Sequence, residues 1–252
     1  MNDEQLIRLY QKVSKHSNYQ ILPQQIKRLL PQDSISVISR NEKERLDYIC
    51  SKLDVTGFKV ADIGGNTGYF SFELLEKGAD KVYYYEGNYE HFQFVSYAAK
   101  HLNLDSRLIT NNSYIDFKSL DIPNFDCILL LNVLHHVGDD YGDKDLNKED
   151  VQESILDAIK LLAFKTKFLV LQIGFNWKGS PKLPIFDNGL KSEIVSLISL
   201  VIDFYEVISV GVAVKDGVSI RYENLSDMNN QRDESLGEFL NRPLFILRSK
   251  KF

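Results

Sequence analysis

Two adjacent histidines follow a near-continuously apolar stretch of the chain, and both could take part in chemistry. Residues 125–132 read FDCILLLN, and His135 and His136 come shortly afterwards. Because imidazole titrates near neutral pH, either side chain could remove a proton from a hydroxyl group. Neighbouring residues at a strand end point in different directions, so we expect only one of them to face a reaction centre; a structural role for both is the alternative. Asp140, in the acidic loop that follows, is a third catalytic candidate.

A glycine-rich turn between two expected strands is the second place where the sequence indicates chemistry. Residues 58–88 read FKVADIGGNTGYFSFELLEKGADKVYYYEGN, with Asp62 at the end of the first strand and Glu86 at the end of the second. Glycines let a ligand approach the backbone closely, and Asn66 tolerates the left-handed conformation that such a turn needs. The start of the following helix would offer unpaired N–H groups to a carboxylate. In an open α/β sheet, ligands bind beyond the carboxyl ends of the strands, where Glu86 could accept both hydroxyls of a ribose.

The type of nucleoside is indicated by the spacing of the turn. Gly64, Gly65 and Gly68 do not give the G-x-G-x-x-G pattern of dehydrogenases. The pattern D-x-G-x-N-x-G instead resembles motif I of class I S-adenosylmethionine-dependent methyltransferases, which is usually D-x-G-x-G-x-G; Asn66 is the departure. The stretch from residue 125 to residue 137, FDCILLLNVLHHV, resembles the segment after the fourth strand of that family, which often ends in Leu-His-His.

This resemblance implies a cofactor, S-adenosylmethionine, and residues that would hold it. Asp62 and the glycine turn would bind its methionine part and Glu86 its ribose. Ser113 stands where the family often has an acidic residue that reads the adenine amino group, and Asn112 beside it could do the same; an ordinary polar strand end is the alternative. The residues that we assign to the cofactor on this basis are Asp62, Gly64, Gly65, Asn66, Gly68, Tyr69, Phe70, Glu86, Gly87, Asn112, Ser113, Asn132 and Val133.

A narrower resemblance concerns the acceptor. Together with the C-terminal RPLFILRS, the two motifs look like the methyltransferase part of O-antigen chain-terminating enzymes and other glycan methyltransferases. Such enzymes act on a sugar hydroxyl or a phosphate. Guanidinium groups match phosphate oxygens well, although a solvated loop arginine is the common alternative. The residues that we assign to the acceptor are Tyr141, Lys178, Arg221, Arg232 and Arg242.

Composition places the chain among globular proteins and argues against some partners. Its 252 residues are 44% hydrophobic and 26% charged, with a net charge of −5. No apolar run reaches the length of a membrane span, and the N-terminus lacks a signal-peptide pattern. The two cysteines form no disulfide framework. We therefore expect a cytoplasmic protein in which Cys127 is a buried, inert thiol. We also expect no metal: Asp139, Asp140, Asp143 and Asp145 could hold one, but acids in a loop are usually solvated.

Alternating strand and helix patterns predict the architecture. The predicted fold is α/β: a Rossmann-like, seven-stranded methyltransferase sheet over residues 57–252, mostly parallel with an antiparallel last strand and helices on both faces. Residues 1–56 are predicted to form an N-terminal helical cap; a lid that uses Tyr10, Tyr19 or Arg40 is the alternative. The predicted strands are 59–63, 81–85, 107–110, 125–132, 166–173, 205–215 and 243–248, with a long connection over 216–242. The predicted helices are 5–15, 24–30, 41–53, 69–77, 88–102, 149–162 and 186–204.

Three functions remain open at this point. The first is methyl transfer from S-adenosylmethionine to an oxygen of a glycan or other small polar acceptor. The second is RNA methylation, against which the acidic composition argues, as does the lack of an Asn-Pro-Pro-Tyr-type motif after the fourth strand. The third is a catalytically inactive methyltransferase fold that serves as a binding subunit, which the departure at Asn66 keeps open. The sequence does not distinguish oligomeric states.

Overall fold

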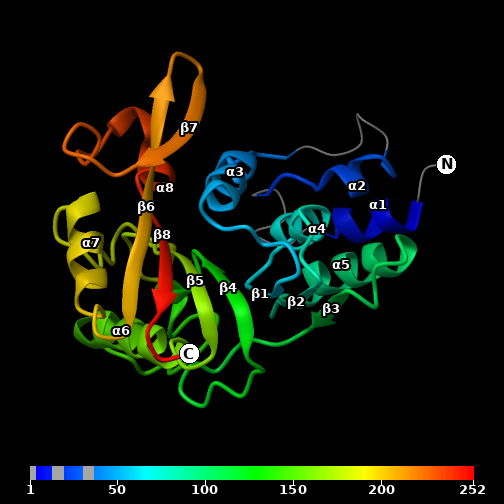
Figure 1. Cartoon of the computed structure of the whole chain (residues 1–252), viewed down its shortest axis with the longest axis horizontal. Helices are drawn as coiled ribbons and strands as arrows, with labels where there is room; N and C mark the ends of the chain where they lie inside the picture. The colour runs from blue at the N-terminus through cyan, green and yellow to red at the C-terminus, as the bar shows by residue number, and fades with distance from the viewer. Residues whose placement is uncertain (1–3, 13–19, 31–36) are drawn as a thin grey trace. The chain divides into compact units, whose positions relative to one another are not determined.

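The computed structural model describes residues 4–12, 20–30 and 37–252 (Figure 1). Contacts between residues divide the chain into two units. The first comprises residues 1–42 and 54–114, and the second comprises residues 43–53 and 115–252. The segment predicted as one N-terminal cap therefore contributes to both units.

The first unit is built on three parallel strands. They are β1 (Lys59–Ile63), β2 (Lys81–Tyr85) and β3 (Leu108–Asn111), in the order β3-β2-β1. Strands of a parallel sheet need crossover connections, which helix α4 (Tyr69–Glu76) and helix α5 (Tyr89–His101) provide. Asp62 at the end of β1 lies opposite Tyr84 of β2. This pairing brings the two strand ends that carry the predicted cofactor residues side by side.

Local signals in the sequence set the helix boundaries of the first unit. Asn88 caps α5, because its side chain accepts hydrogen bonds from the backbone N–H groups of Glu90 and His91. Helix α4 ends before Gly78, whose φ of +96° is the left-handed conformation that glycine adopts easily. Two N-terminal helices, α1 (Glu4–Gln11) and α2 (Gln24–Lys27), complete this unit. Tyr10 of α1 packs edge-on against Phe94 of α5, with ring centroids 5.4 Å apart.

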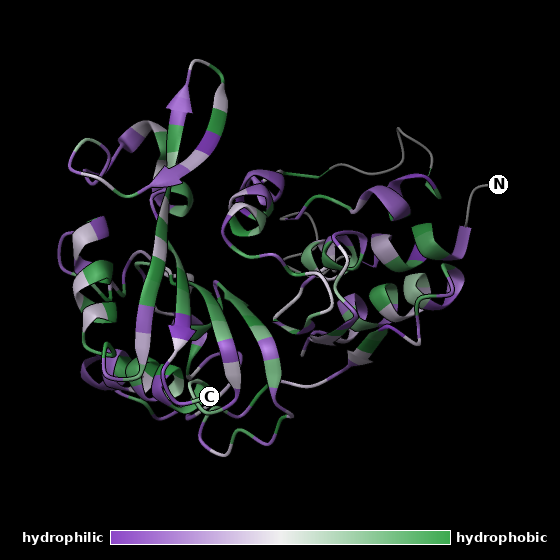
Figure 2. Cartoon of the chain, viewed as in Figure 1, coloured by the Kyte–Doolittle hydropathy of each residue, from purple (hydrophilic) through white to green (hydrophobic). Residues whose placement is uncertain are grey.

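The second unit is a five-stranded mixed sheet. Its strands are β4 (Phe125–Leu131), β5 (Thr166–Gln172), β6 (Tyr205–Asp216), β7 (Ser219–Asn224) and β8 (Leu244–Ser249), in the order β4-β5-β8-β6-β7. Strands β4 and β5 are parallel, and the other neighbouring pairs are antiparallel. Figure 2 shows long apolar stretches in these strands. Fully buried residues along β4, β5 and β8 form the core: Ile128, Leu130, Leu169, Val170, Leu171, Ile246 and Leu247.

Three longer helices belong mainly to this unit: α3 (Glu42–Lys52), α6 (Val151–Leu162) and α7 (Lys191–Ser199). Helix α7 is shorter than the predicted 186–204. The carboxylate of Glu193 accepts hydrogen bonds from the backbone N–H groups of Asn188 and Leu190, at 3.1 and 2.7 Å, which places the helix start at Lys191. Short 3₁₀ helices also occur, among them η1 (Leu134–His136) and η3 (Trp177–Gly179).

The strand count and the last hairpin differ from the prediction. The described residues contain eight strands rather than seven, because the connection predicted over 216–242 holds β7 and the short helix α8 (Gly237–Leu240). Gly217, with a φ of +60°, supplies the tight turn that allows β6 to continue directly into β7. The predicted antiparallel last strand is confirmed: β8 lies between β5 and β6 and is antiparallel to both. No helix among the described residues is long and apolar enough to cross a membrane.

Candidate functional site

The turn after β1 has the backbone conformation that its sequence predicts. Gly64, Asn66 and Gly68 have φ angles of +71°, +52° and +83°. All three lie in the left-handed region, which glycine adopts freely and asparagine tolerates better than most residues. The turn is tied to the neighbouring strand, because the N–H groups of Gly64 and Gly65 both donate to the carbonyl of Tyr85. Asn66 thus adopts the left-handed conformation that a glycine would adopt readily at this position.

Tyr84 supports the turn from the side of the sheet. A Cβ atom on Gly65 would lie 2.6 Å from the Tyr84 ring, so only glycine fits at this position. The Tyr84 hydroxyl donates a hydrogen bond to the carbonyl of Asn66 at 2.5 Å. Burial raises the pKa of Tyr84 well above its ordinary value, and the nearby carboxylates of Glu86 and Asp62 add to this shift. The hydroxyl therefore stays protonated and remains a donor to the turn.

Asp62 braces the turn from inside the protein. The residue is 3% exposed, and its carboxylate accepts a hydrogen bond from the Ser71 hydroxyl at 2.6 Å. Burial raises its pKa to about 6, and the hydrogen bonds from Ser71 partly offset that effect. In this conformation the carboxylate points to helix α4 rather than outward. Asp62 therefore holds the end of β1 and the start of α4 together, which is a supporting role for any ligand bound at the turn.

Glu86 lies at the end of β2, and its side chain is 11% exposed. One carboxylate oxygen accepts the backbone N–H of Asn66 at 2.9 Å, and the other accepts that of Asn88 at 2.8 Å. The imidazole Nδ1 of buried His91 is 4.0 Å from the same carboxylate. These contacts orient the Glu86 carboxylate at the end of β2, and each carboxylate oxygen can accept more than one hydrogen bond.

The first N–H group of helix α4 already has a partner within the protein, whereas we expected the N–H groups at this helix start to be unpaired. The side-chain oxygen of Gln20 accepts hydrogen bonds from the backbone N–H of Tyr69 at 3.0 Å and from the hydroxyl of Thr67 at 3.1 Å. The N–H of Thr67 donates to the side chain of Asn66 at 2.7 Å. A helix N-terminus needs such acceptors, and here an N-terminal side chain supplies one. Tyr69 and Phe70 are themselves buried, at 5% and 3% exposure.

The end of β3 places polar and aromatic side chains beside the end of β2. The amide nitrogen of Asn112 donates to the backbone carbonyl of Glu86 at 2.9 Å, so this side chain joins the two strand ends. Ser113 is exposed. The ring of Tyr114 covers Gly87 so closely that a Cβ there would lie 2.1 Å from a ring carbon. Tyr114 is 53% exposed and offers an aromatic face at this edge, which we did not predict.

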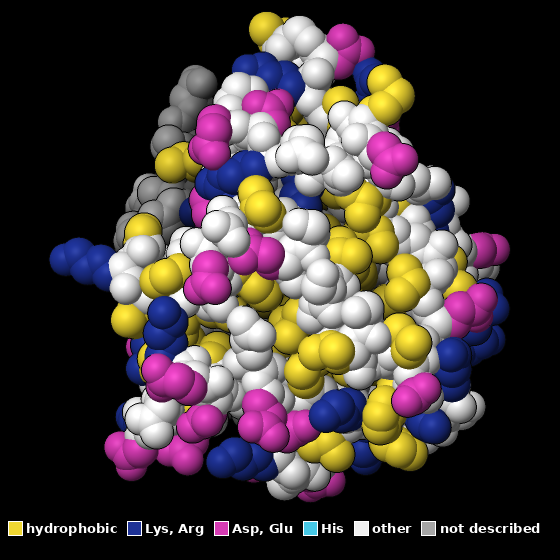
Figure 3. Space-filling view, turned by 90° about the vertical axis from the view of Figure 1, so that its left-hand side faces the viewer, with side chains coloured by type: hydrophobic (Ala, Val, Ile, Leu, Met, Phe, Trp, Pro, Cys, Tyr) yellow, Lys and Arg dark blue, Asp and Glu magenta, His cyan; other side chains and the backbone are white. Residues whose placement is uncertain are grey.

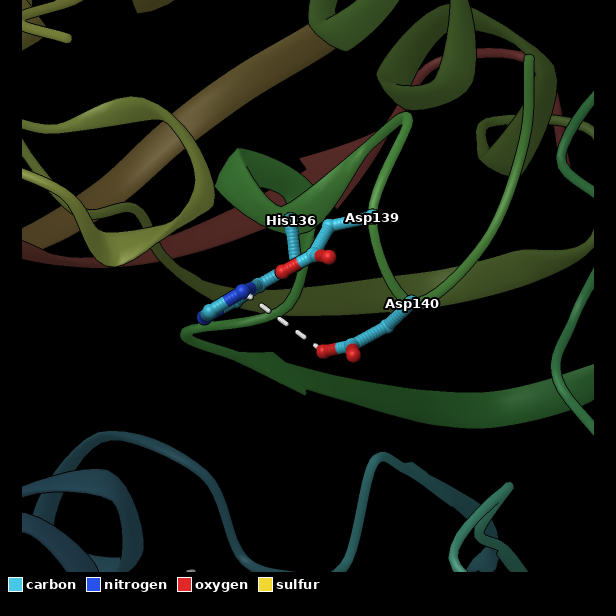
Figure 4. Close-up of side chains that lie close together, drawn as sticks. All are labelled: His136, Asp139 and Asp140. Atoms are coloured by element: carbon cyan, nitrogen blue, oxygen red, sulfur yellow. Dashed lines mark ion pairs between the residues drawn. The ribbon is translucent and has the colours of Figure 1, made fainter. Parts of the chain in front are cut away.

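In the second unit, the two histidines have different surroundings. His135 is 2% exposed, and its Nδ1 accepts a hydrogen bond from the backbone N–H of Gly174 at 3.1 Å. Burial lowers the pKa of His135 well below its ordinary value, and the positive charge of Arg242 lowers it further. His135 is therefore neutral and held inside the fold. His136 is partly exposed, with its Nδ1 3.5 Å from the carboxylate of Asp140, and is the better placed of the two for chemistry (Figure 4).

A network of buried and half-buried polar groups links the ends of β4 and β5. Asn132, with a φ of +63°, donates to the side chain of Gln172 at 3.0 Å and accepts from Arg242 at 2.8 Å. Gln172 donates to the backbone carbonyl of Arg242 at 2.9 Å. The Arg242 guanidinium forms two hydrogen bonds to the carboxylate of Glu238, which also accepts the N–H of Phe175. Arg242, predicted to bind an anionic acceptor, is therefore turned into this network and 7% exposed.

The other predicted acceptor residues each have partners within the protein. Arg221 on β7 pairs with Asp216 and Glu223, each at 2.6 Å. Arg232 donates to the carbonyl of Gly189 and pairs with Glu234. Lys178 lies over the Trp177 ring at 4.3 Å, and Tyr141 donates to the carbonyl of Leu134.

Two residues predicted to bind the cofactor lie in the second unit. The Asn132 side chain is occupied by Gln172 and Arg242, and the neighbouring Val133 is half-buried.

Sequence reasoning missed residues whose roles depend on contacts distant in the chain. Gln20 reaches the glycine turn across 49 residues, and no local pattern marks it. The sequence did offer a signal for Gln172. This residue ends the apolar strand TKFLVLQ, in which Thr166 is the only other uncharged polar residue. Arg45 of α3 donates to Gln172 at 3.3 Å and is 4% exposed. A basic residue on a helix is usually solvated, so its burial was not predictable.

Comparisons with known proteins bear on the fold. No family model matches the sequence, and a search of curated proteins found no match either. Among solved structures, a co-crystal of WbdD with a kinase inhibitor is 18% identical, with a TM-score of 0.61 over 96% of this chain and 47% of that chain. A second WbdD structure, described as the bifunctional kinase-methyltransferase, is 15% identical, with a TM-score of 0.56 over 96% and 46%.

A third solved structure, the Thermoplasma acidophilum protein 1320, is 12% identical, with a TM-score of 0.50 over 98% of this chain and 97% of that chain. The chain spans about half the length of the WbdD structures that it matches. Likeness at these identities defines the fold. The chain has the class I methyltransferase fold, as its strand pattern and glycine turn predict.

Proposed function

We propose that the chain is an S-adenosylmethionine-dependent methyltransferase that acts on an oxygen of a glycan or another small polar acceptor. The observation that carries this proposal is the hydrogen bond from Asn66 to Glu86 at 2.9 Å. It joins the glycine turn after β1 to the acidic end of β2 within one unit. A strand end of this kind is where open α/β sheets bind nucleosides.

The first unit offers an acceptor for the ribose of this cofactor and a turn whose backbone a ligand can approach. Glu86 is oriented by two backbone N–H groups, and a carboxylate at this strand end is the kind of acceptor that binds a ribose diol. The left-handed glycines, Gly64 and Gly68, keep two positions of the turn free of side chains. Tyr114, exposed beside Gly87, offers a flat face of the kind on which a base can stack. When bound, S-adenosylmethionine supplies a methyl group that is already activated as a sulfonium.

The protein then has to position the acceptor and take up its proton. His136 is the stronger candidate for that role, because His135 is buried and neutral with its Nδ1 engaged by Gly174. Asp140 lies 3.5 Å from Nδ1 of His136 and can stabilise the protonated imidazole. Both roles are proposals that rest on the local geometry of the second unit.

The acceptor class rests on the charge distribution and on the resemblance of the motifs. The net charge is −5, and the face in Figure 3 carries acidic and basic side chains intermixed. Nucleic-acid binding usually gathers basic residues on one face, so a small polar acceptor is the better supported class. The resemblance of the motifs to glycan methyltransferases points to a sugar hydroxyl or a phosphate.

A transfer assay with methyl-labelled S-adenosylmethionine tests this proposal. We would offer the chain an oligosaccharide, the same oligosaccharide with a terminal phosphate, and total transfer RNA. We expect label in one of the two sugars. Label in RNA alone would contradict the acceptor class. Tight cofactor binding without label in any of the three would favour the alternative of an inactive binding subunit.

A further inference from the structure

The 3₁₀ turn after β4 brings an imidazole and two carboxylates together. His136, Asp139 and Asp140 each offer one ligand atom, and these atoms all lie within 4.8 Å of one another. Figure 4 shows the three side chains gathered on one side of the turn. From this juxtaposition we propose that the second unit binds one divalent transition-metal ion, of the Zn²⁺ or Co²⁺ type, through His136, Asp139 and Asp140.

The turn fixes the spacing of the three groups. The backbone N–H groups of Asp139 and Asp140 both donate to the carbonyl of His136, at 3.0 and 3.2 Å. The next segment closes the turn, since the N–H of Gly138 donates to the carbonyl of Tyr141 at 2.7 Å. Trp177 anchors it from a distant part of the chain through a hydrogen bond to the carbonyl of Val137. Such anchoring holds potential ligands in place before a metal arrives.

The separation between His136 and Asp140 is longer than a direct hydrogen bond and close to that between two ligands of one metal ion. Nδ1 of His136 and the nearer oxygen of Asp140 are 3.5 Å apart. A charge-assisted hydrogen bond is shorter, at about 2.7–2.9 Å. Two ligands on a tetrahedral ion with bonds of about 2.1 Å lie about 3.4 Å apart. The observed separation is therefore close to that of two ligands sharing one ion.

The imidazole distinguishes this cluster from an ordinary acidic loop and selects the metal. Imidazole nitrogen suits Zn²⁺ and its neighbours in the first transition row, whereas Mg²⁺ prefers oxygen ligands alone. Three protein ligands leave positions open for water or an acceptor oxygen. A metal on Nδ1 leaves the ring proton on Nε2, so His136 can act as a proton acceptor only while the metal site is empty.

The remaining acids of the same loop provide matched controls. Asp143 is 3.7 Å from Nζ of Lys118, which already balances its charge. Asp145 is exposed, and its backbone N–H donates a hydrogen bond to the carboxylate of Asp143. These two acids lie within ten residues of His136 in the sequence but outside the cluster. Replacing Asp145 removes one loop charge without removing a ligand.

Cobalt titration followed by visible absorption tests the proposal, with the chain first treated with a chelator. Wild type should bind one Co²⁺ ion per chain with a ligand-field band, and Zn²⁺ should displace it while Mg²⁺ should not. His136→Ala and Asp140→Asn should each weaken Co²⁺ binding by about 100-fold or more. This exceeds the roughly 10–100-fold loss that follows removal of a residue that only hydrogen-bonds to a metal ligand. Asp139→Asn, at an exposed position, should do the same without endangering the fold, and Asp145→Asn should bind as wild type does.

Circular dichroism would confirm that each variant is folded. The proposal would be overturned if the ligand-field band survived unchanged in His136→Ala and Asp139→Asn. It would also be overturned if every variant bound several ions equally weakly, or if wild type bound none. The measurement involves no methyl transfer, so its failure would leave the proposed function standing. Conversely, failure of S-adenosylmethionine to bind would leave the metal site standing.

Discussion

Replacing Asp62 with asparagine should remove a pH-dependent loss of stability. The Asp62 carboxyl is buried, and burial raises its pKa from 3.8 to about 6 in the folded protein. Between these two values the unfolded chain loses the proton while the folded protein keeps it. Stability should therefore fall as the pH rises through this window and level off above it. The raised pKa corresponds to a total loss of about 3 kcal/mol.

The Asp62→Asn side chain keeps the shape and can still accept the hydrogen bond from Ser71, but it does not ionise. Urea unfolding of both proteins, measured at steps from pH 4 to pH 8, would give the difference in the free energy of unfolding at each pH. Any constant cost of the new amide cancels in this comparison. We expect the difference to change in favour of the variant by about 3 kcal/mol across the window, and to be constant above it.

Asp54 provides a control of opposite sign. It is exposed, and hydrogen bonds to Thr56 lower its pKa, so its ionised form favours the folded state. Asp54→Asn should therefore lose stability relative to wild type as the pH rises. Parallel curves for wild type and Asp62→Asn would refute the reasoning, because they would mean that the Asp62 carboxyl ionises alike in the folded and unfolded chain.

Further variants test the turn and the histidines. Gly65→Ala should destabilise the fold by about 1–3 kcal/mol, the usual cost of overpacking, because the new methyl group meets the buried ring of Tyr84. Urea unfolding would measure this loss, and unchanged stability would contradict the close contact between Gly65 and Tyr84. Asn66→Gly should be neutral or stabilising, whereas Asn66→Ala should cost about 1 kcal/mol at its φ of +52°; equal stability of the two variants would argue against a strained position. His136→Ala should lower methyl transfer with little change in cofactor affinity, and full activity in it and in the His135→Ala variant would exclude both as proton acceptors.

Much of the fold was predictable because its signals are local. Apolar runs such as residues 125–131 become strands buried on both faces, and Asn88 and Gly78 mark helix ends by their own side chains or conformations. Strand β7 was missed because SIRYEN alternates exposed and half-buried residues at a sheet edge, where charged residues are common. Its hairpin depends on Gly217, which the sequence pattern did not single out.

The candidate site was predictable in its residues but less so in their orientation. The motif located the turn and Glu86, whose side chain joins the turn as the proposal requires. It could not show that Asp62 points inward, because Ser71 lies nine residues further on, in helix α4, and meets it only in the fold. Nor could it show that Arg242 pairs with Glu238 and Asn132. Such pairings depend on tertiary contacts that no spacing rule contains.

Calorimetric titration with S-adenosylmethionine is the most direct test of the central claim, that the first unit binds this cofactor through Glu86. Wild type should bind, and Glu86→Ala should bind more weakly by about 1–3 kcal/mol, the value of hydrogen bonds to a charged acceptor. Glu90→Ala is the matched control, since this acidic residue on α5 lies 4.0 Å from Lys12 and should leave affinity unchanged. Absence of binding to wild type at millimolar cofactor, or equal affinity in Glu86→Ala, would contradict the account.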